Sequence, residues 1–163
     1  MRIALMTAIG VTDRMGTYNR TTEAHDWKRR SERLVRASGL PYTIVRPGWF
    51  VCNAPDQHRL VLLQGDRRHA GNSTDGVIAR RQIAQVLVHC LSSNQALRKT
   101  FELVAETGPA TDDLDALLAP IEADLQGALD GVWDMANMPL DKEPPQMRAD
   151  LNTIRSHQSA ATS

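Results

Sequence analysis

The chain has 163 residues, the size of one domain or of a piece of a larger one, and its 19 lysines and arginines balance 19 aspartates and glutamates. Without net charge, binding to nucleic acid or to an anionic membrane is not expected, and no apolar run approaches the roughly 20 residues that cross a bilayer. Two cysteines, Cys52 and Cys90, are too few for a disulfide framework and fit a reducing compartment, so the composition predicts a cytoplasmic protein.

The first part of the chain predicts a strand, a loop and a helix. Residues 3–8 form a short apolar run closed by Gly10, which is typical of a parallel strand covered on both faces. The polar stretch 12–22 predicts a surface loop. In residues 23–38, apolar or small side chains recur at helical spacing, which predicts that they face the protein while the charged residues face solvent. These recurring positions are Trp27, Ser31, Leu34, Val35 and Ser38, and Gly39 ends the helix.

The middle of the chain predicts a second strand and a buried helix. Residues 42–45 are rich in β-branched side chains, and the pair 47–48, proline and glycine, ends the strand. Strand, helix and strand in this order form a βαβ unit, whose strands are parallel. Residues 48–76 are irregular, and only 60–63 predict a strand, in a lobe outside the main sheet. A helix from about residue 79 to 91 is apolar on nearly every side and should be well buried.

The last part predicts one more strand and then weaker patterns. Residues 100–105 form the third strand, and residues 112–118 form a short helix that Thr111 caps, with three leucines on one face. Past residue 119 the periodicity weakens. We therefore divide the chain into a domain portion, residues 1–126, and an irregular or helical tail, residues 127–163.

Two segments carry a resemblance to a known family. The segment Leu40–Phe50 reads LPYTIVRPGWF and follows a helix that carries Lys28, and the segment Ile78–Val86 reads IARRQIAQV. In both, the chain resembles the atypical short-chain dehydrogenase/reductase proteins, which include NmrA-like and sugar-epimerase-like members. The resemblance spans roughly residues 2–110 and implies an α/β fold: the C-terminal half of a Rossmann-like parallel sheet, with about three main strands and covering helices.

The resemblance implies NAD(P) as the cofactor, but only one side of its site. Family members cradle the cofactor's phosphates with a glycine-rich turn upstream of the matched segments, and no G-x-G-x-x-G occurs in this chain. The apolar start of the chain also indicates missing upstream sequence. We therefore expect the N-terminal glycine-rich half to be absent, which argues against nucleotide binding by the chain alone. By resemblance, the residues around the nicotinamide end are Lys28, Arg46, Pro47, Gly48, Trp49 and Phe50.

The resemblance also implies a proton donor, which this chain lacks at the usual place. The family uses a tyrosine four residues before the lysine, and the lysine lowers the pKa of the phenol and holds the nicotinamide ribose. Here the lysine is Lys28, and Ala24 fills the tyrosine position. The family's serine or threonine after the preceding strand corresponds to Thr7 or to the alanine after it. Tyr18 or His25 could replace the tyrosine only if their loop folds inward. The predicted catalytic residues are thus Lys28, Thr7 and Tyr18.

Several of these residues also have a purely structural interpretation. Lys28 belongs to a basic run on a helix, which is usually solvated, and Arg46 can simply anchor a loop at a strand end. The five histidines show no metal-ligand spacing, so no metal site is predicted. The adjacent pair His89 and Cys90 predicts a packed core cysteine, because neighbours in a helix do not face one site.

A half sheet would leave residues 3–8 as an open edge, which is an association site. We therefore expect a homo-oligomer, or a complementing chain along this edge. Three functions stay open. The first is an NAD(P)-binding oxidoreductase that acts on a small molecule such as a carbonyl compound or quinone. The second is a non-catalytic binding or regulatory module of the NmrA-like kind, and the third is a hydrolytic or other activity in a pocket formed by the oligomer.

Overall fold

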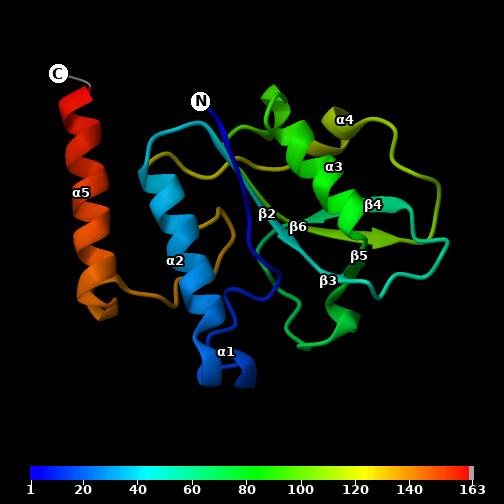
Figure 1. Cartoon of the computed structure of the whole chain (residues 1–163), viewed down its shortest axis with the longest axis horizontal. Helices are drawn as coiled ribbons and strands as arrows, with labels where there is room; N and C mark the ends of the chain where they lie inside the picture. The colour runs from blue at the N-terminus through cyan, green and yellow to red at the C-terminus, as the bar shows by residue number, and fades with distance from the viewer. Residues whose placement is uncertain (162–163) are drawn as a thin grey trace.

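The computed structural model describes residues 1–161, which form one mixed sheet with helices on both faces (Figure 1). The strands are β1 (Ile3–Met6), β2 (Tyr42–Pro47), β3 (Trp49–Phe50), β4 (Arg59–Leu63), β5 (Val77–Ile78) and β6 (Lys99–Glu106). The α-helices are α1 (Thr17–Thr22), α2 (Ala24–Ala37), α3 (Arg80–Cys90), α4 (Leu114–Leu118) and α5 (Pro145–Ala161). Single turns of 3-10 helix cover Ser73–Asp75, Asn94–Ala96 and Leu140–Lys142. Within residues 1–161, no helix is long and apolar enough to cross a bilayer.

Three parallel strands form the centre of the sheet, as predicted. β1 pairs with β2, with Ile3 opposite Tyr42, and β2 pairs with β6, with Val45 opposite Phe101. α2 connects the first two of these strands, and α3 lies between the second and third in the sequence. This alternation of parallel strands and helices is Rossmann-like, so the predicted α/β fold with a partial parallel sheet is confirmed.

The segment after β2 does not form a separate lobe. β4 runs antiparallel to β6, with Leu60 opposite Ala105, and β5 also pairs with β6 while β3 pairs with β5. The sheet order is therefore β1-β2-β6-β5-β3, with β4 on the other side of β6. The prediction of a lobe outside the main sheet is wrong because β6 offers a free edge, and pairing with it satisfies the backbone of β4 and buries Leu60.

One face of the sheet, under α3 and α4, is apolar. Phe101 and Leu103 of β6 belong to one core cluster with Ile83 and Cys90 of α3. Burial raises the pKa of Cys90 to about 11, so the predicted core cysteine is confirmed. The prediction that α3 is buried on nearly every side is wrong, since Val88 is 68% exposed. Only one stripe of a helix can face a single sheet.

Helix α2 lies on the other face of the sheet and turns its charged side inwards, the reverse of the prediction. Arg29, Arg33 and Arg36 are buried, whereas Trp27 is 47% exposed. Of the predicted inward positions, Leu34 is partly buried, and it packs against α5 rather than the sheet. The periodicity predicted the wrong buried side because arginine can also be buried. Its aliphatic stem packs on apolar surface when carboxylates or carbonyls accept hydrogen bonds from its guanidinium group.

The partners of these arginines come from residues 124–143, which we call the strap. Asp130 accepts hydrogen bonds from Arg29 at 3.0 Å and from Arg33 at 2.7 Å. Arg33 also donates to the backbone carbonyl of Met138 at 2.7 Å. The strap is largely irregular, so its carbonyls need donors from outside it, and arginine side chains supply them. α5 follows and packs outside α2, on the far left of Figure 1.

A buried ionic layer separates α2 from the sheet. Its members are Glu32, Arg36, Arg46, Glu102, Asp124 and Asp134. Arg46 lies between Glu32 and Asp134, with a nitrogen-to-oxygen distance of 2.7 Å to each. Burial would raise the pKa of Glu32, but Arg46 and Arg36 hold it below its usual value. Mutual pairing of this kind is what allows ionised groups to lie inside a protein.

The start of α4 differs in detail from the prediction. Asp113, not Thr111, caps the helix, because its carboxylate accepts from the backbone N–H of Ala116 at 2.9 Å. The hydroxyl of Thr111 instead accepts from the backbone N–H of Leu60 at 3.0 Å, which ties it to β4. Both residue types cap helices, and the contact with β4 decides between them. Leu114 and Leu118, two of the three leucines predicted to share a face, are buried.

β1 is the last strand at one end of the sheet. Within residues 1–161, only β2 pairs with it. In Figure 1 this segment, in dark blue, runs down from the N-terminus between α2 and α3. The strand therefore presents unpaired N–H and C=O groups on its outer side.

Candidate functional site

A cavity of about 530 Å³ lies at the carboxyl ends of β1 and β2. Parallel α/β sheets bind ligands just outside the carboxyl ends of their strands, and binding pockets commonly enclose about 300–1,000 Å³. The position and size of this cavity thus suit a small-molecule ligand. Its lining residues are Ala8, Ile9, Gly10, Asp13, Tyr18, His25, Lys28, Pro47, Gly48, Trp49, Phe50, His69, Gly71 and Asp75.

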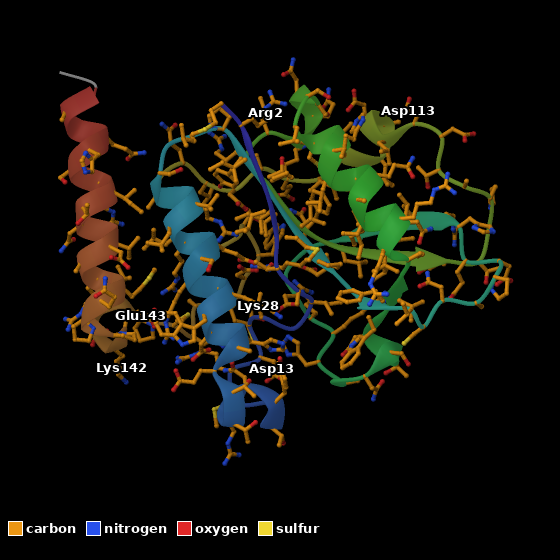
Figure 2. All side chains as sticks on the ribbon, in the orientation of Figure 1. Arg2, Asp13, Lys28, Asp113, Lys142 and Glu143 are labelled. Carbon is orange, nitrogen blue, oxygen red and sulfur yellow. The ribbon has the colours of Figure 1, made fainter. Side chains whose placement is uncertain are left out.

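Most of the predicted site residues meet at this cavity. Lys28 comes from the second turn of α2 and Tyr18 from α1, and residues 47–50 run from the end of β2 through the turn at Gly48 into β3. Figure 2 labels Lys28 and Asp13 near the lower end of α2, where the loop after β1 meets the helix. Segments far apart in the sequence therefore contribute to one site.

Thr7 and Arg46 are the two predicted site residues that do not line the cavity. The hydroxyl of Thr7 donates to Glu32 at 2.7 Å. Arg46 is fully buried between Glu32 and Asp134. Burial would lower the pKa of Arg46, but these carboxylates raise it well above its usual value. Neither side chain lines the cavity, because that of Thr7, just after β1, and that of Arg46, in β2, point into the ionic layer and are held there.

The turn after β2 forms one wall of the cavity and requires glycine. A Cβ on Gly48 would lie 2.5 Å from the carbonyl oxygen of Gly76, whose carbonyl also accepts from the backbone N–H of Trp49 at 2.9 Å. This close approach joins β3 to β5. Trp49 and Phe50 are nevertheless 44% and 39% exposed, so the two-residue strand β3 brings two aromatic residues to the cavity.

A single carboxylate shapes the loop that follows β1. Asp66 accepts from the backbone N–H of Gly10 at 2.6 Å and from that of Thr12 at 2.7 Å. Asp75 plays a similar part on the opposite wall, where it accepts from the backbone N–H of Ala70 and of Gly71. Sequence reasoning missed both aspartates. An aspartate beside glycine at a strand end is the only signal for Asp66, and such pairs are common in ordinary turns.

The segment 12–22 folds inward, so the prediction of a surface loop is wrong for part of it. Thr12 and Asn19 are buried. The side chain of Asn19 donates to the carboxylate of Asp26 and accepts from its backbone N–H, both at 3.0 Å, which docks α1 on the start of α2. This docking brings the ring of Tyr18 to 5.1 Å from that of His25, edge to face. The loop therefore folds inward, which was the condition for Tyr18 or His25 to reach the site.

Two of the titratable side chains around the cavity, Lys28 and His25, are partly desolvated. Burial lowers the pKa of Lys28. Burial also lowers the pKa of His25, and the positive charge of Lys28 lowers it further. Ala24 does not line the cavity, although it holds the position where the resemblance places a tyrosine. Within residues 1–161, no group of three histidine, cysteine or acidic side chains is arranged to hold a metal ion.

Comparison with known proteins gives the family of the chain. The model of a family described as NAD(P)H-binding matches residues 1–94. The chain is 35% identical over 124 residues to Protein TIC 62, chloroplastic, from Oryza sativa subsp. japonica, which covers 73% of this chain. It is 32% identical over 98 residues to sanguinarine reductase from Eschscholzia californica, which covers 58% of this chain.

The matches concern only part of each relative. The chain spans 20% of the length of the rice protein and 35% of the length of the Eschscholzia protein. A solved structure, a putative NAD-dependent epimerase/dehydratase from Bacillus halodurans, is similar with 21% identity and a TM-score of 0.44, over 72% of this chain and 48% of that one. The assignment of the chain to a family therefore rests on the match to the NAD(P)H-binding family.

Proposed function

Because the chain belongs to the NAD(P)H-binding family, we propose that its cavity is the nicotinamide side of an NAD(P)-dependent oxidoreductase site. One observation carries the proposal: Lys28 and the turn 47–50, distant in sequence, line the same cavity at the carboxyl ends of two parallel strands. The same cavity walls are apolar where β1 and β2 end and charged where α2 begins. A nicotinamide riboside has the matching polarity, with a flat ring and a hydroxyl-bearing sugar.

The residues present fit that group. The ammonium of Lys28 can donate to the ribose hydroxyls, and partial desolvation of the site strengthens such a charged hydrogen bond. Pro47 and Gly48 leave room for a ring beside the backbone, since neither projects a long side chain. Trp49 and Phe50 offer aromatic faces on which a flat acceptor molecule stacks. When bound, the dinucleotide would supply a hydride.

The acceptor that we propose is a small carbonyl compound or quinone. The chain contains only three tryptophans, two tyrosines and two phenylalanines, and one of each kind lines the cavity: Trp49, Tyr18 and Phe50. Exposed aromatic side chains gathered at one opening mark a binding surface for apolar molecules. One relative is a reductase by name, which agrees with reduction of an organic acceptor.

A non-catalytic binding or regulatory module is the second candidate, and Ala24 favours it. Without a phenol at that position, the cavity can hold a nicotinamide and still lack the family's usual proton donor. A hydrolytic activity has less support, because none of the cavity's lining residues is serine, threonine or cysteine. The oxidoreductase and the non-catalytic module can both bind the nucleotide, so a measurement of turnover is needed to distinguish them.

Titration with NADPH tests the proposal. Fluorescence enhancement of NADPH by the purified protein is expected even without a glycine-rich turn, because the proposed contacts hold the nicotinamide side of the cofactor. Lys28→Ala should weaken the affinity about tenfold or more, since a hydrogen bond to a charged group is worth about 1.5–3 kcal/mol. Lys142→Ala is the matched control: this lysine is exposed near the start of α5, away from the cavity, and its loss should change nothing (Figure 2). Failure to bind NADPH or NADH at millimolar concentration would refute the proposal.

A further inference from the structure

The cavity contains a titratable group that the resemblance does not assign. Ala24 occupies the place of the family's proton donor, and its methyl group cannot give up a proton. We propose that His25 is the proton donor of this cavity and that Tyr18 holds its imidazole in position. This inference rests on the proposed oxidoreductase function and names the acid that would complete it.

Position on α2 places His25 beside Lys28. The two residues are three apart in the helix, so their side chains project from the same face, and both line the cavity. Ala24, at the tyrosine position, does not line it. The proton donor that we propose therefore lies one residue further along the helix than the resemblance implies. It is the imidazole of residue 25 instead of a phenol at position 24.

The imidazole is held from two sides. On one side the edge-to-face contact with Tyr18 has a centroid distance of 5.1 Å and an interplanar angle of 63°. On the other side lies the backbone at Gly10, where an added Cβ would be 3.4 Å from Cε1 of His25. Gly10 has a φ of +84°, which non-glycine residues rarely adopt, so the sequence keeps this side open for the ring. A ring held in this way is preorganised for proton transfer.

The proposed step balances in atoms and electrons. A hydride from the reduced nicotinamide adds to the carbonyl carbon of the acceptor, and the C=O π pair moves onto oxygen. The N–H bond of the His25 imidazolium breaks, and its proton forms the new O–H bond. The acceptor becomes an alcohol, the two electrons are those of the hydride that the dinucleotide would supply, and neutral His25 regains its proton from the solvent, so that one solvent proton is consumed in each turnover. The ammonium of Lys28, which the proposed function places at the ribose, adds positive charge near the developing negative charge on the acceptor oxygen.

The charged and titratable groups that face His25 come from four segments. Lys28 lies on α2, Asp13 lies on the loop after β1, and Tyr18 lies on α1. The segment after β4 adds Asp66, with His69 and Asp75 on the cavity wall. Burial lowers the pKa of His25 and Lys28 lowers it further, whereas Asp66, Asp13 and the Gly10 backbone oppose this shift. The imidazolium is therefore a stronger acid than in water, and the rate should fall as pH rises above the pKa of His25.

His25 suits the role better than its two neighbours. Tyr18 is 55% exposed and reaches the cavity from its rim. His69 is exposed, and its Nε2 lies 3.3 Å from the hydroxyl of Thr12, on the side of the loop that Asp66 holds. Of the three, His25 alone is carried by the helix that also carries Lys28.

The test compares His25→Asn, Tyr18→Phe and a control, His58→Asn, which replaces an exposed histidine outside this cavity. NADPH affinity, the urea midpoint and the pH profile of kcat/KM are measured with an aromatic aldehyde as acceptor. His25→Asn should lower kcat about a hundredfold or more and remove the fall in rate at high pH, with NADPH affinity and folding preserved. Tyr18→Phe keeps the ring contact and should lower kcat less than tenfold, and the control should match the wild type.

Three results would overturn this assignment. The first is full activity with an unchanged pH profile in His25→Asn. The second is a larger loss in Tyr18→Phe than in His25→Asn, which would make the phenol the acid. The third is tight NADPH binding without reduction of the aldehyde by the wild type, which would support the non-catalytic module instead. Absence of NADPH binding would be the separate failure of the proposed function.

Discussion

Glu102 shows how a single residue is affected by the ionic layer. The layer contains the four carboxyl groups of Glu32, Glu102, Asp124 and Asp134 but only two guanidinium groups. Burial raises the pKa of Glu102 to about 8, although Arg46 lies 3.4 Å away and lowers it, and Asp66 adds to the increase. Arg46 instead makes its shorter contacts with Glu32 and Asp134.

This pKa predicts that the protein loses stability as the pH rises. Between about 4.5, the usual pKa, and about 8, folded Glu102 keeps a proton that the unfolded chain releases. The free energy of unfolding should therefore fall with increasing pH over this interval, by at most about 1.4 kcal/mol per pH unit from this group. Urea unfolding at pH 5.5, 7 and 8.5 measures the slope.

Glu102→Gln should flatten that slope, because glutamine keeps the shape and does not ionise. Glu106→Gln is the matched control on the same strand, since its partly exposed side chain pairs with Arg59 at the surface. An equal slope in wild type and Glu102→Gln would show that other groups cause the pH dependence.

At the scale of the element, α2 and the strap depend on each other. The strap is largely irregular, and α2 turns its charged side to the sheet and Leu34 and Ala37 toward α5, so neither packs as a simple amphipathic element. Asp124 joins them to the sheet: its carboxylate accepts from Arg36 at 3.1 Å, from Tyr42 at 2.9 Å and from Thr100 at 2.6 Å. A single buried carboxylate thus connects the helix, β2 and β6.

Asp124→Asn should destabilise the protein by about 3–5 kcal/mol, the usual cost of leaving a buried charge without its partner. The reason is that Arg36 stays ionised and buried after the substitution, with only Glu32 to pair with it. Asp141→Asn, at an exposed position of the same strap, should change the free energy of unfolding by less than about 0.5 kcal/mol. Chemical denaturation of both variants checks the difference, and similar stabilities would contradict the role given to Asp124.

At the scale of the whole molecule, the sheet ends at β1, where residues 1–161 provide no further strand. We propose that a second copy of the chain covers this edge, since open edges of sheets associate. Met6, at the end of β1, is 46% exposed there and offers an apolar contact. The chain spans only part of the relatives that it matches, so their whole-protein assemblies do not decide this point.

Light scattering on the purified protein tests whether a second copy of the chain covers the open edge of β1. A mass of at least twice that of one chain is expected at micromolar concentration, and Met6→Lys should shift it toward the monomer, because an edge lysine opposes strand pairing. Met135→Lys adds the same charge on the strap, where the side chain is 52% exposed, and should leave the mass unchanged. A soluble wild-type monomer would refute the association.

Local sequence patterns were enough to predict the three parallel strands, the helices between them and the turn 47–50, because periodicity, β-branched runs and glycine positions act over a few residues. The family resemblance added Lys28, which lines the cavity. Long-range packing determined which side of α2 is buried, that Thr7 and Arg46 face the ionic layer, and that His25 lies in the cavity. The burial of α2 and of Arg46 depends on carboxylates 101 and 88 residues away in the sequence, Asp130 and Asp134, since a charge is buried favourably only when it is paired.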